Sequence, residues 1–567
     1  MTIHRKKRRF GAILEPLWIP LAGFALSTTL LLSFPMERIT IFVVDDAYYY
    51  LKVALNVANQ GQFTFDGIHR TSGFHPLWQT LLAAIAFVVH DEFALLYAAL
   101  VLESLLACLA GVLLYFYVKE VFGKPNALIA QSLWSLNGGL ILTWHLMGME
   151  NTLFSCLLLA SLLATRKVLR HPDPSLATTL LTGLIFSCTF LSRTDSILLL
   201  IFLVSLLFFK GLFRQPRSLA SAGRVILILG TTIGAYLLFN IAETGYGFPI
   251  SGTVKVRQGL VAIEQMGGIL TTTFWERTVA SIRHLAGLLK WHLLSVPLSA
   301  WPRADDPWLW NGLRLLGIIP AVGYLGGTIL HLRNAPGPRR FRNSGLTTVE
   351  ICLLCYAAFH TSIEVTLLAP TLTWTSWYLV PQILLVIIVA SGLLYPWSFL
   401  RGESGSPSAT SEKGRPYVYF LPALFAFGMI WCSFVYLGTL PQQGRQGMWN
   451  TEGFALALWM RQNIPPEARI GAWDTGLWSY FSGRTIINLD GLMNDYEFYH
   501  QYLSRGRIDE YIDKEDIEYL ITWTGQFNQC RALQIRRCLD GEILYRTPEW
   551  TITGGTAGVQ VVKLAKP

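Results

Sequence analysis

Two adjacent carboxylates, Asp45 and Asp46, are the residues of this 567-residue chain most clearly placed for chemistry, in the stretch FVVDDAYYYLKVAL. They follow an apolar run and precede three tyrosines. A carboxylate held beside a hydroxyl group can remove its proton as a general base. Two neighbouring carboxylates cannot both stay charged cheaply without a cation, so the pair also predicts a basic partner or a divalent ion. The simpler alternative is that the two acids only end a helix at a membrane surface.

Further candidates stand at the borders of other apolar runs. They are His75 in TSGFHPLW (71–78), Glu150 in MGMENTLF (147–154), Arg193 and Asp195 in LSRTDS (191–196), Lys255 in GFPISGTVKV (247–256), and Trp377 and Tyr378 in WTSWYLVP (374–381). Each has a plainer alternative. Arg193 and Asp195 suit a structural ion pair, and Trp and Tyr gather at every membrane interface.

The composition indicates a polytopic membrane protein. The chain is 52% hydrophobic and 14% charged, against about 25% charged residues in an average soluble protein. Its mean hydropathy is +0.41. The net charge of +9 sits in short segments between apolar runs, which is typical of cytoplasmic loops and not of a nucleic-acid-binding surface. No GxGxxG or P-loop pattern is present, so we expect no nucleotide cofactor.

Apolar runs predict about eleven spans, with the basic N-terminus in the cytoplasm and the C-terminus outside. They fall at 11–34, 93–118, 126–143, 152–165, 176–191, 196–209, 224–243, 312–331, 345–368, 377–397 and 417–438. This topology leaves two long outer loops, 35–92 and 244–311. Within them, 75–89 and 279–301 are expected to be helices lying in the outer interface. All the candidate residues above then meet at the outer face of the cytoplasmic (inner) membrane.

The spans stop at about residue 440. Beyond it, ARIGAW, YFSGRTIINLDG and EYIDKEDIEYLITW alternate short strand and helix patterns. We therefore expect an α-helical membrane module over 1–439 and a small extracytoplasmic α/β domain over 440–567. Cys530 and Cys538 lie in this second part, where a disulfide is expected if the region is extracytoplasmic.

The motifs, taken in order, resemble the GT-C superfamily of integral-membrane glycosyltransferases. This group includes protein O-mannosyltransferases, aminoarabinose transferases of lipid A and oligosaccharyltransferase catalytic subunits. DDAYYY followed by TSGFHPLW is similar to their first outer loop, which carries an acidic pair and often a His-Pro or Lys-Pro-Pro motif. The sequence departs from the better-known patterns of this superfamily at two points: the acidic pair is Asp-Asp, and His75-Pro76-Leu77 lacks a second proline. The subfamily and its acceptor are therefore not indicated by these motifs.

The resemblance implies a sugar donor on a polyprenyl phosphate and a glycan, lipid or protein acceptor. Asp45 is then the expected general base, with Asp46 second, and transfer would invert the sugar. Lys255 is the favoured group for the leaving phosphate, with His75 and Arg193 as other cations. A divalent ion, Mg²⁺ or Mn²⁺, would take Asp45, Asp46 and Glu150 as ligands. Trp377 and Tyr378 could stack on a sugar face.

Two other classes of function stay open. A transporter or flippase of lipid-linked sugars should line a path through the spans with charges, yet the span interiors hold few, and the exceptions are Glu103, Glu350 and Glu364. A membrane scaffold would need no ordered set of acidic, basic and aromatic motifs on one face.

Overall fold

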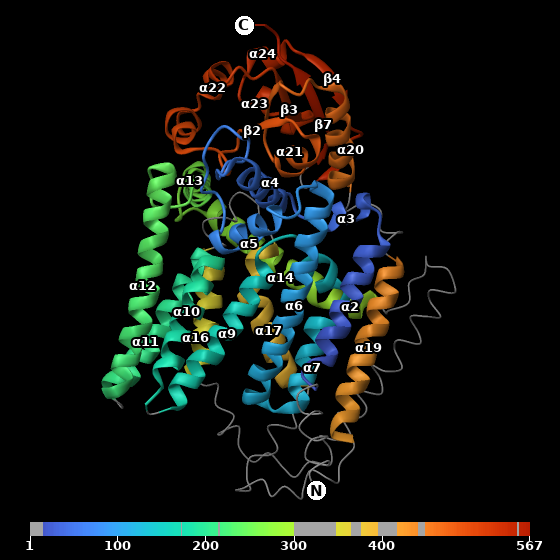
Figure 1. Cartoon of the computed structure of the whole chain (residues 1–567). Coiled ribbons are helices and arrows are strands. Elements are labelled where there is room, and N and C mark those ends of the chain that lie inside the picture. Colours follow the sequence, from blue (N-terminus) through green and yellow to red (C-terminus); the bar gives the residue numbers. More distant parts are fainter. Residues whose placement is uncertain are drawn as a thin grey trace, which may run out of the picture.

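The computed structural model describes residues 15–171, 173–213, 216–299, 348–363, 376–394, 417–439, 448–552 and 555–566. It consists of a bundle of helices with a small α/β part at one end (Figure 1). Three features predicted from the sequence lie outside the described residues: the basic N-terminus, the span 312–331 and Glu364.

The bundle is built from apolar helices that run roughly side by side (Figure 1). Within the described ranges they are α2 (Trp18–Ser33), α6 (Glu92–Phe122), α7 (Lys124–Ser135), α9 (Asn151–Arg170), α10 (Leu176–Ser192), α11 (Ile197–Phe213), α12 (Pro216–Thr244), α16 (Thr348–Ile363), α17 (Val380–Leu394) and α19 (Tyr417–Thr439). Four segments among the described residues are long and apolar enough to cross a membrane: Glu92–Phe122, Asn151–Arg170, Thr194–Phe213 and Leu219–Thr244. The predicted helical membrane fold with a small C-terminal sheet is confirmed, whereas the number of spans stays a prediction.

One predicted span, 126–143, is broken. Helix α7 ends at Ser135, and a short turn α8 (Gly138–Leu140) and a π-helix η1 (Ile141–His145) follow it. The side chain of Asn137 starts the new turn, because its Oδ1 accepts hydrogen bonds from the N–H groups of Gly139 (3.0 Å) and Leu140 (3.4 Å). Hydropathy did not reveal this break, because Asn137 is a single polar residue within a long apolar run.

The first outer loop is mostly helical. It contains α3 (Met36–Phe42), α4 (Asp45–Gln60) and α5 (Pro76–Ala86). Helix α4 ends at Gly61 in the left-handed conformation, and α5 begins with a proline at its first position. The 11 residues of α5 are too few to cross a membrane, as predicted for 75–89. In the second outer loop, α13 (Ile250–Gln265) precedes α14 (Thr272–Ser299), which begins before the predicted residue 279 and packs against α8 and α19.

The C-terminal part contains a five-stranded sheet in the order β2-β1-β3-β7-β4. Strands β1 (Arg469–Ala472), β2 (Thr485–Asn488) and β3 (Tyr519–Trp523) are parallel to one another. Strand β7 (Val559–Lys563) pairs antiparallel with β3, and β4 (Glu542–Arg546) pairs antiparallel with β7. A hairpin of β5 (Trp550–Ile552) and β6 (Gly555–Ala557) lies apart from this sheet. The helices and helical turns are α20 (Met448–Asn463), α21 (Gly476–Ser482), η8 (Phe498–Tyr502), η9 (Leu503–Arg505), α22 (Ile508–Lys514), η10 (Gly525–Phe527), α23 (Gln529–Ala532) and α24 (Arg536–Leu539). The disulfide between Cys530 and Cys538, expected from the sequence, joins α23 to α24.

The C-terminal part packs directly on the first outer loop (Figure 1). The carboxylate of Asp45 accepts hydrogen bonds from the backbone N–H groups of Gly476 (3.0 Å) and Leu477 (2.8 Å), which begin α21. The Tyr49 hydroxyl accepts another from the N–H of Thr475 (3.1 Å). Gly476 permits this approach, since a Cβ there would lie 2.1 Å from the backbone oxygen of Asp45.

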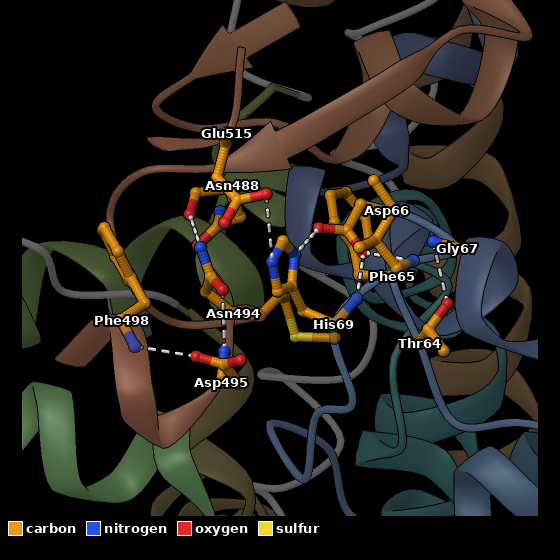
Figure 2. A network of polar contacts seen from close by, with 12 residues as sticks. Thr64, Phe65, Asp66, Gly67, His69, Asn488, Asn494, Asp495, Phe498 and Glu515 are labelled. Atoms are coloured by element: carbon orange, nitrogen blue, oxygen red, sulfur yellow. Dashed lines mark hydrogen bonds and ion pairs between the residues drawn. The ribbon is translucent and has the colours of Figure 1, made fainter. Parts of the chain in front are cut away.

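A second contact between the same two parts centres on His69 (Figure 2). Its Nδ1 lies 2.7 Å from Asp66 in the loop after α4, and its Nε2 lies 3.5 Å from Glu515 after α22. Burial alone would lower the pKa of His69, but the hydrogen bond and charge of Asp66, with the charges of Asp495 and Glu515, raise this pKa to about 9. The imidazolium therefore joins carboxylates from both parts of the chain at neutral pH.

We expect the substitution Gly476→Ala to destabilise the protein, because the added Cβ overlaps backbone that cannot move freely. The cost should be about 1–3 kcal/mol, typical of overpacking. Thermal unfolding of the detergent-purified protein measures it. Gly230→Ala on α12 is the matched control, because a Cβ there meets nothing within 4 Å. Equal unfolding midpoints for the two variants would contradict the close contact at Asp45.

The stabilising effect of His69 should depend on pH. Its folded-state pKa exceeds the ordinary value of 6.5, so its contribution is complete below about 6.5 and is lost as the pH rises through about 9. The thermal unfolding midpoint of the wild type should fall over this range more steeply than that of His69→Gln. His90→Gln, which alters an exposed histidine, serves as the control and should follow the wild type. Parallel pH curves for wild type and His69→Gln would refute this role.

Candidate functional site

A cavity of about 250 Å³ lies where the bundle meets the C-terminal part. Of the residues predicted from the sequence, all but Asp45 line it: Asp46, His75, Glu150, Arg193, Asp195, Lys255, Trp377 and Tyr378. They come from α4, α5, the loop before α9, the turn after α10, α13 and the turn before α17. Motifs more than 300 residues apart in sequence therefore enclose one cavity.

The two adjacent carboxylates have different environments. Asp45 points to the C-terminal part and accepts the two N–H groups of α21, while Asp46 lines the cavity. Successive helical residues point about 100° apart, so one position on α4 serves docking and the next faces the cavity. The structure thus places Asp46, and not Asp45, in the lining of the cavity, and which of the two acts as the base stays a prediction.

Burial acts on both carboxylates. It raises the pKa of Asp45 to about 7, although the N–H groups of Leu477 and Gly476 act in the opposite sense. Burial also raises the pKa of Asp46, and the positive charge of Lys255 opposes that rise. The Lys255 Nζ lies 3.9 Å from Asp46 Oδ2 and donates a hydrogen bond to the Tyr378 hydroxyl at 2.6 Å. The sequence predicted either a basic partner or a divalent ion for the acid pair, and Lys255 is a basic partner of Asp46.

Arg193 is the structural centre of the opposite wall. Its guanidinium donates to Asp195 (3.1 Å from Nε to Oδ1), to Glu150 Oε1 (3.1 Å) and to the carbonyl of Trp377 (3.1 Å). The side chain is only 2% exposed, so these contacts replace its hydration. The ion pair of Arg193 and Asp195, an open alternative in the sequence, is present and extends to Glu150.

Glu150 retains one oxygen that faces no donor. Its Oε2 is buried and, among the described residues, has no hydrogen-bond partner. Its Oε1 accepts from Arg193 and lies 3.7 Å from Nε2 of His75. A buried acceptor oxygen beside a cavity is ready to accept a hydrogen bond from a bound hydroxyl group.

Of the three acids predicted as metal ligands, Asp46 and Glu150 line the cavity and Asp45 does not. Within the described ranges, no group of three or more His, Cys, Asp or Glu side chains is arranged to hold a metal ion. Asp45 is turned to α21, which leaves Asp46 and Glu150 as carboxylates facing the cavity. Mg²⁺ is usually held by one or two carboxylates together with substrate phosphate and water, so a divalent ion at Asp46 and Glu150 stays a prediction.

Several residues of the site carried no recognisable signal in the sequence. Leu492 and Met493 cover the cavity from the C-terminal part, and Gly73 lies so close to them that a Cβ there would be 2.1 Å from the carbonyl oxygen of Leu492. His360, inside an apolar run, places its Nε2 2.9 Å from Asp195 Oδ2. Apolar residues in a distant domain and a single histidine in a span look like ordinary packing before the fold is known.

Comparison with known proteins agrees with this arrangement. Residues 74–236 match a family model described as dolichyl-phosphate-mannose-protein mannosyltransferase. Residues 442–561 match a second model, described as a domain of unknown function (DUF8728). No curated protein matches the chain.

Solved structures share the fold over nearly the whole chain. ArnT from Cupriavidus metallidurans bound to undecaprenyl phosphate superposes with a TM-score of 0.51 at 12% identity, covering 97% of this chain and 98% of that one. The apo state of the same protein gives a TM-score of 0.50 at 12% identity, covering 98% of each chain. The archaeal oligosaccharyltransferase AglB from Archaeoglobus fulgidus, in complex with an inhibitory peptide and a dolichol-phosphate, gives 0.42 at 12% identity, with 96% and 74% covered.

The resemblance to integral-membrane glycosyltransferases of the GT-C type, predicted from the sequence, is confirmed by the family model over 74–236 and by the shared fold. At 12% identity, the structural likeness concerns the fold.

Proposed function

We propose that this enzyme transfers a sugar from a polyprenyl-phosphate donor to an acceptor hydroxyl in the cavity beneath the C-terminal part, with Asp46 as general base. The observation that carries the proposal is one cavity that holds a carboxylate of raised pKa beside an ammonium group. Such a pair can accept a proton from the acceptor and stabilise a leaving phosphate in the same step.

The reaction we propose is a single displacement. The acceptor oxygen forms a bond to the anomeric carbon as its proton passes to Asp46, and the bond from that carbon to the phosphate oxygen breaks. The phosphate leaves with the electron pair and remains on its lipid. Because no covalent sugar–enzyme intermediate intervenes, the configuration at the anomeric carbon is inverted.

Lys255 is the cation best placed to stabilise the negative charge of the leaving phosphate. Arg193 is nearby, but its guanidinium already contacts Asp195, Glu150 and the carbonyl of Trp377. Lys255 is 27% exposed and contacts the cavity together with Tyr378. His75, 24% exposed, is a second donor, and burial lowers its pKa, so the neutral ring is favoured. We infer that Lys255, and not a divalent ion, balances the charge on Asp46.

The lipid tail has a candidate groove next to the cavity. A second hollow of about 410 Å³ lies between α5, α10 and α12 and is lined mainly by aromatic and aliphatic side chains. Phe74 lines both this groove and the cavity. A donor could therefore lay its isoprenoid chain in the groove while its phosphate reaches Lys255.

The same arrangement suggests how the acceptor approaches the cavity and how the protein is oriented in the membrane. The acceptor, a glycan, lipid or protein, would approach under Leu492 and Met493, which make the roof apolar. We propose that the cavity is at the outer face of the inner membrane, with the N-terminus cytoplasmic, because the basic last turn of α9, with Lys167 and Arg170, lies at the end of that helix away from Glu150. Nucleotide sugars are cytoplasmic, so a lipid-linked donor suits this side.

A transport function has less support. Among the described residues, the acids within apolar helices are engaged in local contacts. Glu103 accepts a hydrogen bond from the N–H of Gly148 at 2.7 Å, and Glu350 pairs with Arg166 and accepts from the Tyr117 hydroxyl. Paired groups of this kind hold helices together and do not mark out a path for a charged headgroup.

Deletion of the gene should cause a polyprenyl-phosphate sugar to accumulate and one glycan modification to disappear, both measured by mass spectrometry. Asp46→Asn should fail to restore the modification, since loss of a general base costs about 10²–10⁴-fold in rate. Asp45→Asn is the matched variant and should restore it, with a lower thermal unfolding midpoint. If Asp45→Asn is inactive and Asp46→Asn active at equal expression, Asp46 is not the base.

Once the donor is identified, Lys255→Ala should lower kcat about 10²-fold in detergent-purified enzyme. It should also move the acid limb of the pH–rate profile to higher pH. The base acts when ionised, so activity rises with pH through the pKa of Asp46, and removal of the positive charge raises that pKa further. Lys255→Arg should retain most activity, and Arg257→Ala, an exposed position on α13, should be neutral. An unchanged acid limb in Lys255→Ala would contradict the pairing.

A further inference from the structure

A third hollow of about 380 Å³ lies on the bundle surface where α9 contacts α6 and α10. We call it the α9 groove. Helix α9 begins beside Glu150 at the cavity and runs 20 residues to Arg170, a length of about 30 Å. The α9 groove lies along the second half of this helix, so it is separate from the candidate active site.

The walls of the α9 groove are apolar and face outward. Its floor is one face of α9, and the walls come from α6 and α10; the apolar lining residues are Leu113, Ala160, Leu163, Ala164, Leu181 and Ile185. Leu180 and Leu184 on α10 and Leu109 and Phe116 on α6 are exposed on the same helices. In a membrane protein such side chains contact acyl chains, so the groove opens to lipid.

One end of the α9 groove carries an excess of positive charge. Its charged and titratable lining residues are Glu120, Lys167, Arg170 and His171. Glu120 is already paired with Arg166 (3.3 Å) and Arg170 (2.8 Å). In the part of the chain that the structure describes, Lys167 is exposed and makes no ion pair. An anion at this end would meet cations that outnumber the single acid.

The end of α9 is also built so that it does not repel an anion. The last carbonyl groups of a helix carry partial negative charge. Here the ammonium group of Lys210 donates hydrogen bonds to the carbonyl oxygens of Leu169 (2.6 Å) and His171 (3.1 Å). The positive charge of Lys210 therefore offsets the partial negative charge of these oxygens. The same hydrogen bonds connect the end of α9 to α11.

We infer that the α9 groove binds an anionic glycerophospholipid, with an acyl chain along the apolar floor and the phosphate at Lys167, Arg170 and His171. An apolar channel with a cationic end matches a lipid that has a negative headgroup and lays one of its two acyl chains in the channel. Under the predicted topology, segment 166–174 faces the cytoplasm, where the leaflet carries anionic lipids. This site is distinct from the donor site and does not rest on the proposed reaction.

Native mass spectrometry of the full-length protein in neutral detergent tests the inference, with phosphatidylglycerol and phosphatidylcholine of equal chain length as probes. Phosphatidylglycerol should bind more tightly, and Lys167→Gln should weaken it about fivefold, the effect of one cation near a lipid headgroup. Ala164→Trp, which fills the apolar floor, should remove the bound lipid. Lys119→Gln is the control, because that side chain stacks on Tyr115 (5.3 Å to the ring centroid).

Three results would overturn the inference. Equal binding of the two lipids would exclude recognition of the anionic headgroup. Equal weakening by Lys119→Gln and Lys167→Gln would show that only the general charge of the surface matters. Displacement of the lipid by inorganic phosphate at the same concentration would show that the apolar floor contributes nothing. Sugar transfer is not part of this readout, so the proposed reaction and the lipid site stand or fall separately.

Discussion

The carboxylate of Asp45 on the first turn of α21 is the contact on which the rest of the site depends. It satisfies two backbone N–H groups that a short helix would otherwise leave unpaired, and it fixes the start of α4. Asn450 secures the same place from the other side, donating to the carbonyl oxygens of Thr40 (2.7 Å), Ile41 (3.2 Å) and Val43 (3.2 Å). With the backbone held this way, the next residue, Asp46, is directed into the cavity.

Around this fixed point, buried charges are balanced locally. Arg193 compensates Asp195 and Glu150 on one wall, and Lys255 compensates Asp46 on the other. The difference between the walls lies in exposure, because Arg193 is 2% exposed and Lys255 is 27% exposed. A cation sealed behind its partners supports the architecture, whereas one that reaches the cavity can act on a substrate. On the proposed function, the same ion types therefore serve structure on one side and chemistry on the other.

Much of the site could be predicted from the sequence, because ionisable groups at the ends of apolar runs must face water, a ligand or a partner. That rule selected the acid pair, and stretches that resemble the GT-C superfamily indicated His75, Glu150 and Lys255. It could not decide between Asp45 and Asp46, because the partner of Asp45 lies 431 residues away at Gly476. Hydropathy likewise found the helices but missed the break at Asn137, where one side chain outweighs a long apolar run.

These contacts make the C-terminal part a component of the active site. It supplies Leu492 and Met493 to the lining of the cavity, and it holds the helix that carries Asp46. Two glycines, Gly73 and Gly476, leave no space for a side chain between the two parts. The bundle resembles a mannosyltransferase family over 74–236, whereas the covering part matches a domain of unknown function. On the proposed function, the donor would bind to the bundle, and the domain that covers the cavity would decide which acceptor hydroxyl can reach Asp46.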